Sequence, residues 1–505
     1  MDMVLYPGDP LTPGIGATKN AKRLDRKDAT TILKIPVLPI SYHDAQPLLA
    51  ALDGTVAPAD WQGSLPITYH VGPGKAMVHL KLEFNWDMVP AYDVVAKITG
   101  NIFPNEWVMR GNHHDAWVNG ASDPISGQSA MLNEAKAIGD LLKTGWKPKR
   151  TIFYCSWDGE QPGLIGSTEY AEEHDKELQE KAVIYVNSDD SGRGFVETGG
   201  SQALETFVDE ITQNVIDPQT KVSIFERHKA MELVRASSVK DKKEILNQKG
   251  GKLDALGSGS DFSSFLQHLG IPSLDIKFDG ENGGGDYHSI YDSYDDYVKF
   301  KDPGFKYEVT LAQTTGHAIL RMADADLLPF DFRSLCNTIN KYVSEVSELV
   351  NTMHDNTEIE NKLIKVNVFT LAADPAKHEQ APIAKAEVPK LDFSALNTAL
   401  DSLKKSADKL AVIFSTAQQQ DNNHEKLNKL LYHAEQQLLS ADGLPRRSWY
   451  RHTIYAPGFY TGYGVKTLPG IREAIEQRNW PEAQQQIKVV AGSINNLAGY
   501  LQAAN

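Results

Sequence analysis

The sequence predicts an α/β protein in which a mainly parallel sheet is followed by a separate helical region. Two observations carry this prediction. From about residue 94 to residue 278, short apolar runs alternate with amphipathic stretches of helical period, which is typical of a mostly parallel sheet with helices on both faces. After about residue 326 the strand signals fade and apolar residues recur at steps of three and four, as in long amphipathic helices.

Individual elements follow from the hydrophobic period. Alternating or continuous apolar runs predict strands at 77–84, 94–101, 107–115, 150–157, 182–189 and 271–278. Amphipathic stretches predict helices between them, at 125–143, 166–180, 202–214 and 260–270. The chain up to about residue 70 is rich in proline and glycine, and we expect loops with little core of their own there.

The C-terminal region carries a long apolar seam. Its members are Phe393, Leu396, Leu400, Leu403, Ala407, Leu410 and Phe414. The same spacing returns at 427–438, and 481–503 is a third helical stretch. Two interpretations of this bundle stay open: it packs only on itself, or it also joins two copies of the chain.

Composition limits the function. With 505 residues, of which 41% are hydrophobic and 23% charged, the chain has the make-up of a soluble protein of two or three domains. Its net charge of -15 disfavours binding to nucleic acid or anionic membranes. No run reaches transmembrane length, and we expect no signal peptide in this chain. Two cysteines, Cys155 and Cys336, make neither a disulfide framework nor a cysteine zinc site.

Potential metal ligands follow three of the predicted strands. His113 and Asp123 follow one strand, and Glu160 follows the next. Asp189 follows the third, and His288 comes much later. Ligand sites in such folds lie beyond the carboxyl ends of the strands, and imidazole and carboxylate groups are good zinc ligands. The order predicts a two-metal hydrolytic centre, in which ions about 3.5–4 Å apart share one carboxylate.

Each of these residues also has a simpler explanation when it is taken alone. Asp123 is explained by a helix N-cap, and His288 by a structural histidine. Glu160 is explained by a solvated loop acid, although beside a metal it would act as a general base. Asp189 and Asp190 are adjacent carboxylates that repel each other unless a cation or donor lies near.

Several long blocks of the chain are shared, in collinear order, with one known family. They are GNHHDAWVNGASDPISG, GWKPKRTIFYCSWDGEQPGLIGSTEYAEE, YVNSDDS, GSGSDFSSFLQHLGIPS, YHSIYDSYDDYVKF, LPFDFR and LPRRSWYRHTIYAPGFYTGYG. On these blocks the chain resembles the glutamate carboxypeptidase II/transferrin receptor family of co-catalytic zinc peptidases. The resemblance covers nearly the whole chain.

The resemblance implies three domains. Residues 1–87 would be a partial protease-associated (apical) segment and connection, 88–325 the zinc-peptidase α/β domain, and 326–505 a transferrin-receptor-like helical dimerisation domain. Family members are commonly homodimers, so a homodimer through the helical domain is implied. The family's apical domain precedes a PGDPLTPG block, which starts here at residue 7, so we expect an N-terminally shortened chain. Family habit implies an extracytoplasmic location, periplasmic or secreted.

The resemblance also implies a set of metal ligands. Asp123 would bridge two zinc ions. His113 and Asp189 would complete one site, and His288 and Gln161 would complete the other. Two zinc ions per chain are therefore implied.

Catalytic roles follow in the same way. By resemblance, Glu160 is the general base on the attacking water and later the proton donor, and Tyr287 hydrogen-bonds the tetrahedral intermediate. Asp115 orients the ring of His113 from behind. We therefore expect a zinc-dependent exopeptidase, either a carboxypeptidase or an aminopeptidase, that hydrolyses small peptides.

Gln161 departs from the family pattern. The family's peptidases usually have Glu-Glu where this chain has Glu160 and Gln161. Because an amide contributes a neutral oxygen and no charge, we expect the second zinc to bind more weakly. The alternative function is a catalytically weak or inactive dimeric receptor or scaffold. A single-zinc acyl-transfer enzyme, such as a glutaminyl cyclase, is a third hypothesis that the long helical C-terminus disfavours.

Substrate recognition departs as well. Glutamate-directed members hold substrate carboxylates with arginines on the strand after GSGxDF and with a Lys-Tyr pair near the C-terminus. The matching positions here are Asp275 with Lys277, and Gly462 with Tyr463. An acid at 275 and no lysine at 462 weaken the case for a glutamate-tailed substrate. By resemblance, the residues expected to contact substrate are Gly259, Ser260, Lys277 and Tyr463.

A calcium site of the family has matching positions here. They are Thr12, the backbone near Ile15, Glu169 and Glu172. Carboxylate and hydroxyl oxygens suit calcium. The alternative is that the two glutamates form a solvated helix face.

Overall fold

The computed structural model describes residues 5–72, 74–248, 250–281, 284–374, 381–419 and 424–503. The chain forms two compact units. One consists of Met1–Thr31 together with Ala91–Asn505, and the other of Ile32–Pro90. The larger unit holds a six-stranded sheet and the C-terminal helices.

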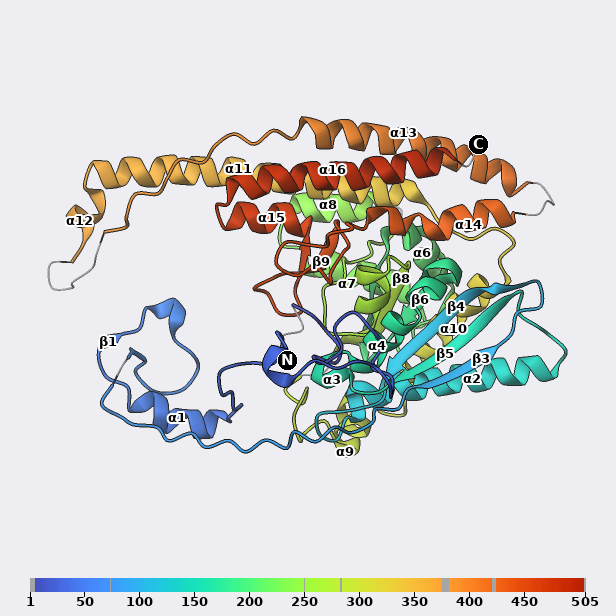
Figure 1. The fold of residues 1–505 in the computed structure, drawn as a ribbon, viewed down its shortest axis with the longest axis horizontal. Coiled ribbons are helices and arrows are strands. Elements are labelled where there is room, and N and C mark those ends of the chain that lie inside the picture. The colour runs from blue at the N-terminus through green and yellow to red at the C-terminus, as the bar shows by residue number, and fades with distance from the viewer. Residues whose placement is uncertain are drawn as a thin grey trace. The chain divides into compact units, whose positions relative to one another are not determined.

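A mixed sheet in the order β3-β5-β4-β6-β8-β7 forms the centre of the larger unit (Figure 1). Its strands are β3 (Val94–Ile98), β4 (Phe103–His113), β5 (Arg150–Trp157), β6 (Ala182–Asn187), β7 (Gly194–Gly200) and β8 (Ser273–Gly280). The four inner strands pair in parallel, whereas β3 and β7 run antiparallel at the two edges. The predicted mainly parallel sheet is confirmed. The antiparallel edge strand β7 was not predicted.

The inner strands are continuous apolar runs because helices cover the sheet. Every residue of β5 and of β6 is buried. The helices α2 (Gly127–Lys143) and α10 (Lys306–Asp324) pack on each other and against β4 and β5, and α5 (Asp175–Lys181) contacts β4 and β6. A strand with both faces buried needs apolar side chains on both, so its sequence shows no alternation.

Shorter helices lie between these strands or follow the last of them. They are α3 (Glu160–Gly163), α4 (Ile165–Glu173), α6 (Glu205–Asn214), α7 (Ile224–Arg235), α8 (Val239–Asn247) and α9 (Tyr294–Asp296). The helix expected at 166–180 is divided at His174, where α4 ends and α5 begins. The helix expected at 260–270 is only a π-helical turn at Ser264–His268.

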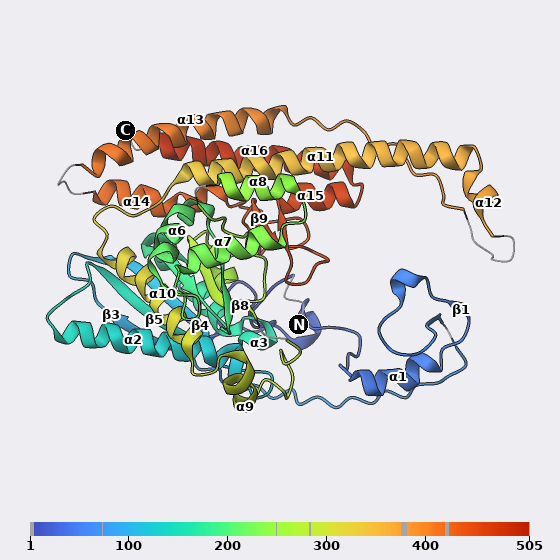
Figure 2. The same ribbon diagram turned by 180° about the vertical axis from the view of Figure 1, so that it is seen from behind.

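The C-terminal region is a helical bundle, as predicted. Figures 1 and 2 show α11 (Phe332–Lys365), α13 (Ser394–Ala417) and α16 (Trp480–Gln502) running alongside one another, and α13 packs on both partners. The predicted seam is buried along α13 at Leu396, Leu400, Leu403, Ala407 and Leu410. The other elements are α12 (Val368–Ala372), α14 (Glu425–His433), α15 (Pro469–Glu476), β9 (Tyr455–Pro457) and β10 (Val465–Thr467).

None of the helices in the described part of the chain is both long and apolar enough to cross a membrane.

The smaller unit consists mainly of loops, as expected. Its elements are α1 (Tyr42–Ala50) and the antiparallel pair β1 (Thr55–Val56) and β2 (His70–Val71). The strand predicted at 77–84 is wrong, because these residues form no strand and nearly all of their side chains are exposed. Alternation of apolar and polar residues yields a strand only where a partner strand satisfies the backbone hydrogen bonds.

A histidine joins the π-helical turn to the C-terminal part of the larger unit. The ring of His268 stacks on Trp449 with centroids 4.5 Å apart, and its Nδ1 lies 2.7 Å from the Trp449 carbonyl oxygen. Burial lowers the pKa of His268 to about 4, from an ordinary value of 6.5. The folded protein therefore holds this ring in its neutral form.

We predict that this histidine makes the folded state less stable in acid. Below about pH 6.5 the unfolded chain takes up a proton that the folded chain refuses until about pH 4. Stability is therefore complete above pH 6.5 and falls as the pH drops, by about 1.4 kcal/mol per pH unit. Urea unfolding should be measured for the parent and for His268→Phe between pH 6.5 and pH 4.5. As the pH falls, the free energy of unfolding of the parent should decrease relative to that of the variant. A difference that stays constant with pH would contradict this account.

Candidate active site

A cavity of about 470 Å³ lies at the carboxyl ends of the parallel strands. Three of the expected site residues reach it from neighbouring strands. His113 is the last residue of β4, Glu160 begins α3 just after β5, and Asp189 lies two residues beyond β6. Parallel pairing of these strands brings together side chains that are far apart in the sequence.

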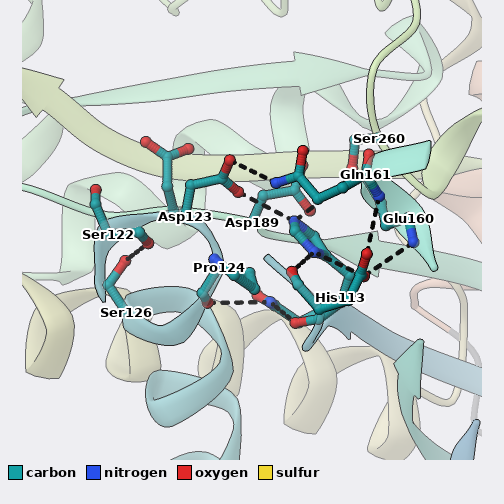
Figure 3. A network of polar contacts seen from close by, with 12 residues as sticks. His113, Ser122, Asp123, Pro124, Ser126, Glu160, Gln161, Asp189 and Ser260 are labelled. Carbon is teal, nitrogen blue, oxygen red and sulfur yellow. Dashed lines mark hydrogen bonds and ion pairs between the residues drawn. The ribbon is translucent and has the colours of Figure 1, made fainter. Parts of the chain in front are cut away.

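Asp123 lies at the centre of the site (Figure 3). Its Oδ1 is 3.1 Å from Nε2 of His113. Its Oδ2 is 3.1 Å from Nε2 of His288 and accepts a hydrogen bond of 2.8 Å from the amide of Gln161. The two oxygens of one carboxylate thus face two different groups of side chains.

The backbone around Asp123 is held by a second carboxylate that was not predicted. Asp292 accepts hydrogen bonds from the backbone N–H groups of Ser122 (2.7 Å) and Asp123 (3.1 Å). The turn therefore depends on a residue that is 169 positions further along the chain. His288 has a positive φ of 56°, which is uncommon for a residue other than glycine and concentrates at functional sites.

Asp115 supports the site from behind. Its carboxylate accepts hydrogen bonds from the backbone N–H groups of Glu160 (2.9 Å) and Gln161 (3.2 Å). Its carbonyl oxygen lies 3.0 Å from Nδ1 of His113, and donation by that nitrogen leaves Nε2 directed at Asp123. Burial disfavours the charged ring, but its contacts with Asp115 and Asp123 outweigh this and raise the pKa of His113 well above its ordinary value.

The site concentrates negative charge in a buried place. Burial raises the pKa of Glu160 well above its ordinary range, and the charge of Asp189 adds to this. Asp261 was not predicted. It is fully buried, and neither of its carboxylate oxygens has a hydrogen-bond partner among the described residues. The charge of His113 offsets only part of the cost of burying these acids. Buried carboxylates with too little counter-charge are costly, so this cluster has the electrostatics of a cation site.

The donor groups fit zinc in their chemistry. Two ligands at zinc distances of about 2.0–2.1 Å and tetrahedral angles lie about 3.3 Å apart. The separation of Asp123 from each of the two histidines is 3.1 Å. In the described ranges, however, no three His, Cys, Asp or Glu side chains are gathered as a complete metal-binding cluster. The Gln161 amide nitrogen, rather than an oxygen ligand, lies against Asp123.

Asn187, which was also not predicted, organises the wall between β6 and β8. Its side-chain nitrogen lies 3.2 Å from Asp189 Oδ1, 2.7 Å from Ser260 Oγ and 2.9 Å from Asp275 Oδ1. The only signal of Asn187 in the sequence was an asparagine at the end of an apolar strand. One amide nitrogen thus contacts three oxygen atoms of residues that line the cavity.

All four residues expected to contact substrate line the cavity: Gly259, Ser260, Lys277 and Tyr463. Gly259 has φ of 93°, and a Cβ there would lie 2.6 Å from the Tyr463 ring. A side chain is therefore excluded at this turn. Ser260 is only 3% exposed and already binds Asn187. Tyr463 and the expected catalytic residue Tyr287 both keep about half of their surface exposed.

The β8 side of the cavity is charged. Lys277 lies 3.7 Å from Asp190 and 3.9 Å from Glu197, and the charge of Asp190 is the main cause of the raised pKa of this lysine. Burial, together with the charge of Asp189, raises the pKa of Asp275 to about 7. The wall thus carries more acids than bases.

A second buried carboxylate pair lies where calcium was expected. Thr12 Oγ1 lies 3.3 Å from Glu169 Oε2. Glu172 accepts hydrogen bonds from the Tyr6 hydroxyl (3.0 Å) and from the Trp449 indole (2.8 Å). Burial raises the pKa of Glu169 to about 8 and that of Glu172 to about 7. These two acids therefore do not form a solvated helix face, and the backbone N–H of Ile15 bonds to the Thr12 carbonyl beside them.

Two protein-family profiles match this chain. Residues 93–302 match peptidase family M28, and residues 391–502 match the transferrin receptor-like dimerisation domain. The first range contains the sheet and the cavity residues from His113 to His288. The second contains most of the C-terminal bundle.

Curated relatives match nearly the whole chain. The probable glutamate carboxypeptidase LAMP1 of Arabidopsis thaliana is 32% identical over 501 residues, which are 97% of this chain and 65% of the relative. The aminopeptidase NAALADL1 of Mus musculus is 30% identical over 527 residues, covering 98% of this chain and 65% of the relative. A probable glutamate carboxypeptidase of Arthroderma benhamiae is 34% identical over 485 residues, covering 92% and 60%.

This chain spans somewhat less than two thirds of the length of these relatives. The predicted resemblance is confirmed in its two matched domains. The chain carries a peptidase family M28 domain followed by a transferrin receptor-like dimerisation domain.

Proposed function

We propose that the chain is a zinc-dependent exopeptidase that hydrolyses small peptides. The observation that carries this proposal is the Asp123 carboxylate, whose two oxygens face His113 on one side and His288 with Gln161 on the other. A shared carboxylate between two sets of donors is the arrangement that a two-metal hydrolase needs. The match to peptidase family M28 and the names of the relatives support the same reaction.

In this proposal the zinc ligands divide into two sets around Asp123. His113 and Asp189 would hold one ion, and His288 and Gln161 would hold the other. Bound zinc would polarise the peptide carbonyl and make water more acidic. Its positive charge would also relieve the repulsion among the buried acids.

The remaining steps belong to the chain's own side chains. Glu160 lies on the cavity wall, 3.8 Å from Nε2 of His113. From this position it can take a proton from the attacking water and later give that proton to the leaving amine. The exposed Tyr287 hydroxyl lines the same cavity and can donate to the carbonyl oxygen as that oxygen gains charge. Asp115 positions both Glu160 and His113.

The second candidate is a catalytically weak or inactive dimeric receptor or scaffold. One observation favours it. The Gln161 amide donates to Asp123 at 2.8 Å, so part of the negative charge at the centre is compensated by a hydrogen bond instead of a cation. Zinc content and peptide cleavage distinguish the two candidates.

We predict that the full chain, purified and supplied with zinc, cleaves small peptides and that a chelator abolishes this activity. Glu160→Gln should lower kcat by about 100-fold or more, because it removes the proton carrier. Zinc content, measured by elemental analysis, should not change in this variant. The control Glu244→Gln removes an exposed acid of α8 and should cleave like the parent. Unchanged cleavage by Glu160→Gln would overturn the assigned mechanism.

We further predict that Gln161→Glu increases zinc binding toward two ions per chain. A carboxylate at this position would repel Asp123 unless a cation lies between them. The metal-free variant should therefore unfold at a lower temperature than the metal-free parent, and zinc should reverse the difference. A parent that binds two ions and cleaves peptides supports the exopeptidase. A parent that binds one or none and cleaves nothing, with activity gained in the variant, supports the scaffold.

We infer that the helical region joins two copies of the chain. The match of residues 391–502 to the transferrin receptor-like dimerisation domain supports this. Large apolar side chains are also exposed in the bundle, such as Ile359 at 54% and Val412 at 67%. Light scattering at micromolar concentration should give twice the mass of one chain. A single-chain mass across that range would contradict the inference.

We infer that Glu169, Glu172, Thr12 and the backbone near Ile15 bind calcium. Two buried acids with raised pKa values support this, because a divalent cation would compensate both. Calcium at about 100 times its Kd should add about 2.7 kcal/mol to the unfolding free energy, which thermal unfolding measures. Glu172→Gln should abolish this shift. Glu173→Gln, which changes the exposed neighbour on the same helix, should keep it, and a parent that does not respond to calcium rules the site out.

A further inference from the structure

One wall of the cavity is a row of charged side chains from a single strand. Asp275, Lys277 and Asp279 of β8 line the cavity. The residues between them, such as Ile276, are buried in the core, as the two-residue period of a strand requires. The strand therefore presents these three charged side chains on one face.

Lys277, the one base on this wall, already forms ion pairs, whereas Asp275 forms none among the described residues. Lys277 reaches Asp190 at 3.7 Å and Glu197 at 3.9 Å. In the described part of the chain, Asp275 takes part in no ion pair. It accepts a hydrogen bond of 2.9 Å from Asn187. The charge of Lys277 acts on Asp275 although the two form no ion pair. This half-buried carboxylate faces the cavity and can still attract a positively charged ligand group.

This acid lies close to the reaction centre. The Asn187 amide nitrogen is 2.9 Å from Asp275 Oδ1 and 3.2 Å from Asp189 Oδ1. The two carboxylate oxygens therefore lie no more than about 6 Å apart. Because Asp189 belongs to the proposed zinc ligands, a cation on Asp275 would be next to the bond that is cleaved.

The short distance between the Asp275 and Asp189 carboxylates indicates which cationic group of a peptide can bind to Asp275. The α-ammonium group of a peptide is two bonds of about 1.5 Å each from its own carbonyl carbon, and it approaches a carboxylate to about 2.7–2.9 Å. A lysine side-chain ammonium is six bonds from the same carbon and would overshoot. We propose that Asp275 binds the free α-amino group of the substrate, so that the enzyme is an aminopeptidase.

The same wall disfavours the other end of a peptide. A terminal carboxylate placed there would meet Asp275 and Asp190, and like charges repel in a poorly solvated site. Lys277, the base that could attract such a group, is shared between two acids. This inference rests on the proposed exopeptidase function and selects the end of the substrate on which it acts.

Binding tests the inference without relying on turnover. Calorimetry at pH 7 would compare leucine amide with N-acetyl-leucine amide on the zinc-supplied full chain. We expect the free amine to bind at least 10-fold more tightly. Asp275→Asn should weaken the amine by about 10- to 100-fold, the range for a hydrogen bond between charged groups, and leave the acetylated compound unchanged. Asp140→Asn, an exposed change of the same kind on α2, should bind like the parent.

Equal binding of the two amides, or no effect of Asp275→Asn, would overturn the inference. The variant is nearly isosteric and removes a buried charge, so its thermal unfolding midpoint should not fall below that of the parent. Cleavage of leucine p-nitroanilide and of N-acetyl-leucyl-leucine distinguishes the proposed function from the proposed role of Asp275. Faster cleavage of the acetylated dipeptide would support the exopeptidase function and contradict binding of the α-amino group by Asp275. Amine binding that depends on Asp275, without cleavage of either compound, would support the role of Asp275 and contradict the exopeptidase function.

Discussion

The site depends on the two-sided contact of the Asp123 carboxylate. Its oxygens face His113 and His288, which come from opposite ends of the peptidase domain. This contact requires the turn that Asp292 holds from 169 residues away, and it requires the parallel strands that end at one edge of the sheet. Neither the loop after β4 nor the loop with His288 could form the site alone. The fold therefore serves to hold one acid between two histidines.

Burial gives this contact its chemical meaning. Glu160 and Asp261 are buried near the centre, and Asp189 is half-buried there. Their pKa values rise because charged forms lose hydration and repel one another. A protein selected only for stability would replace such acids with apolar side chains of similar volume. The proposed zinc ions would compensate these charges, and the neighbouring cavity would give a substrate access to them.

The sequence predicted the parts of the fold and site that leave a periodic or ordered signal. The apolar runs at 150–157 and 182–189 became β5 and β6 because both faces are covered. The order of polar residues after the strands predicted that His113, Glu160 and Asp189 gather beyond the strand ends, and all three line one cavity. The strand at 77–84 failed because alternation cannot supply a partner strand. Asn187 and Asp292 each contribute a single side chain whose partners are distant in the sequence. No local sequence pattern marks such residues, so their roles can be recognised only in the folded structure.

Gln161 places this chain between two kinds of protein. An amide can donate to Asp123 and hold the centre together without metal, which a glutamate cannot do. In the proposed zinc enzyme the same amide would be a weaker, uncharged ligand. The hydrogen bond to Asp123 would then stabilise the metal-free state at the position where affinity for the second ion is reduced. The neighbouring β8 wall supports the opposite conclusion, because Asp275 faces the cavity and forms no ion pair in the described part of the chain. An acid in this position suits a positively charged group that enters the cavity, which favours a site that still receives a substrate.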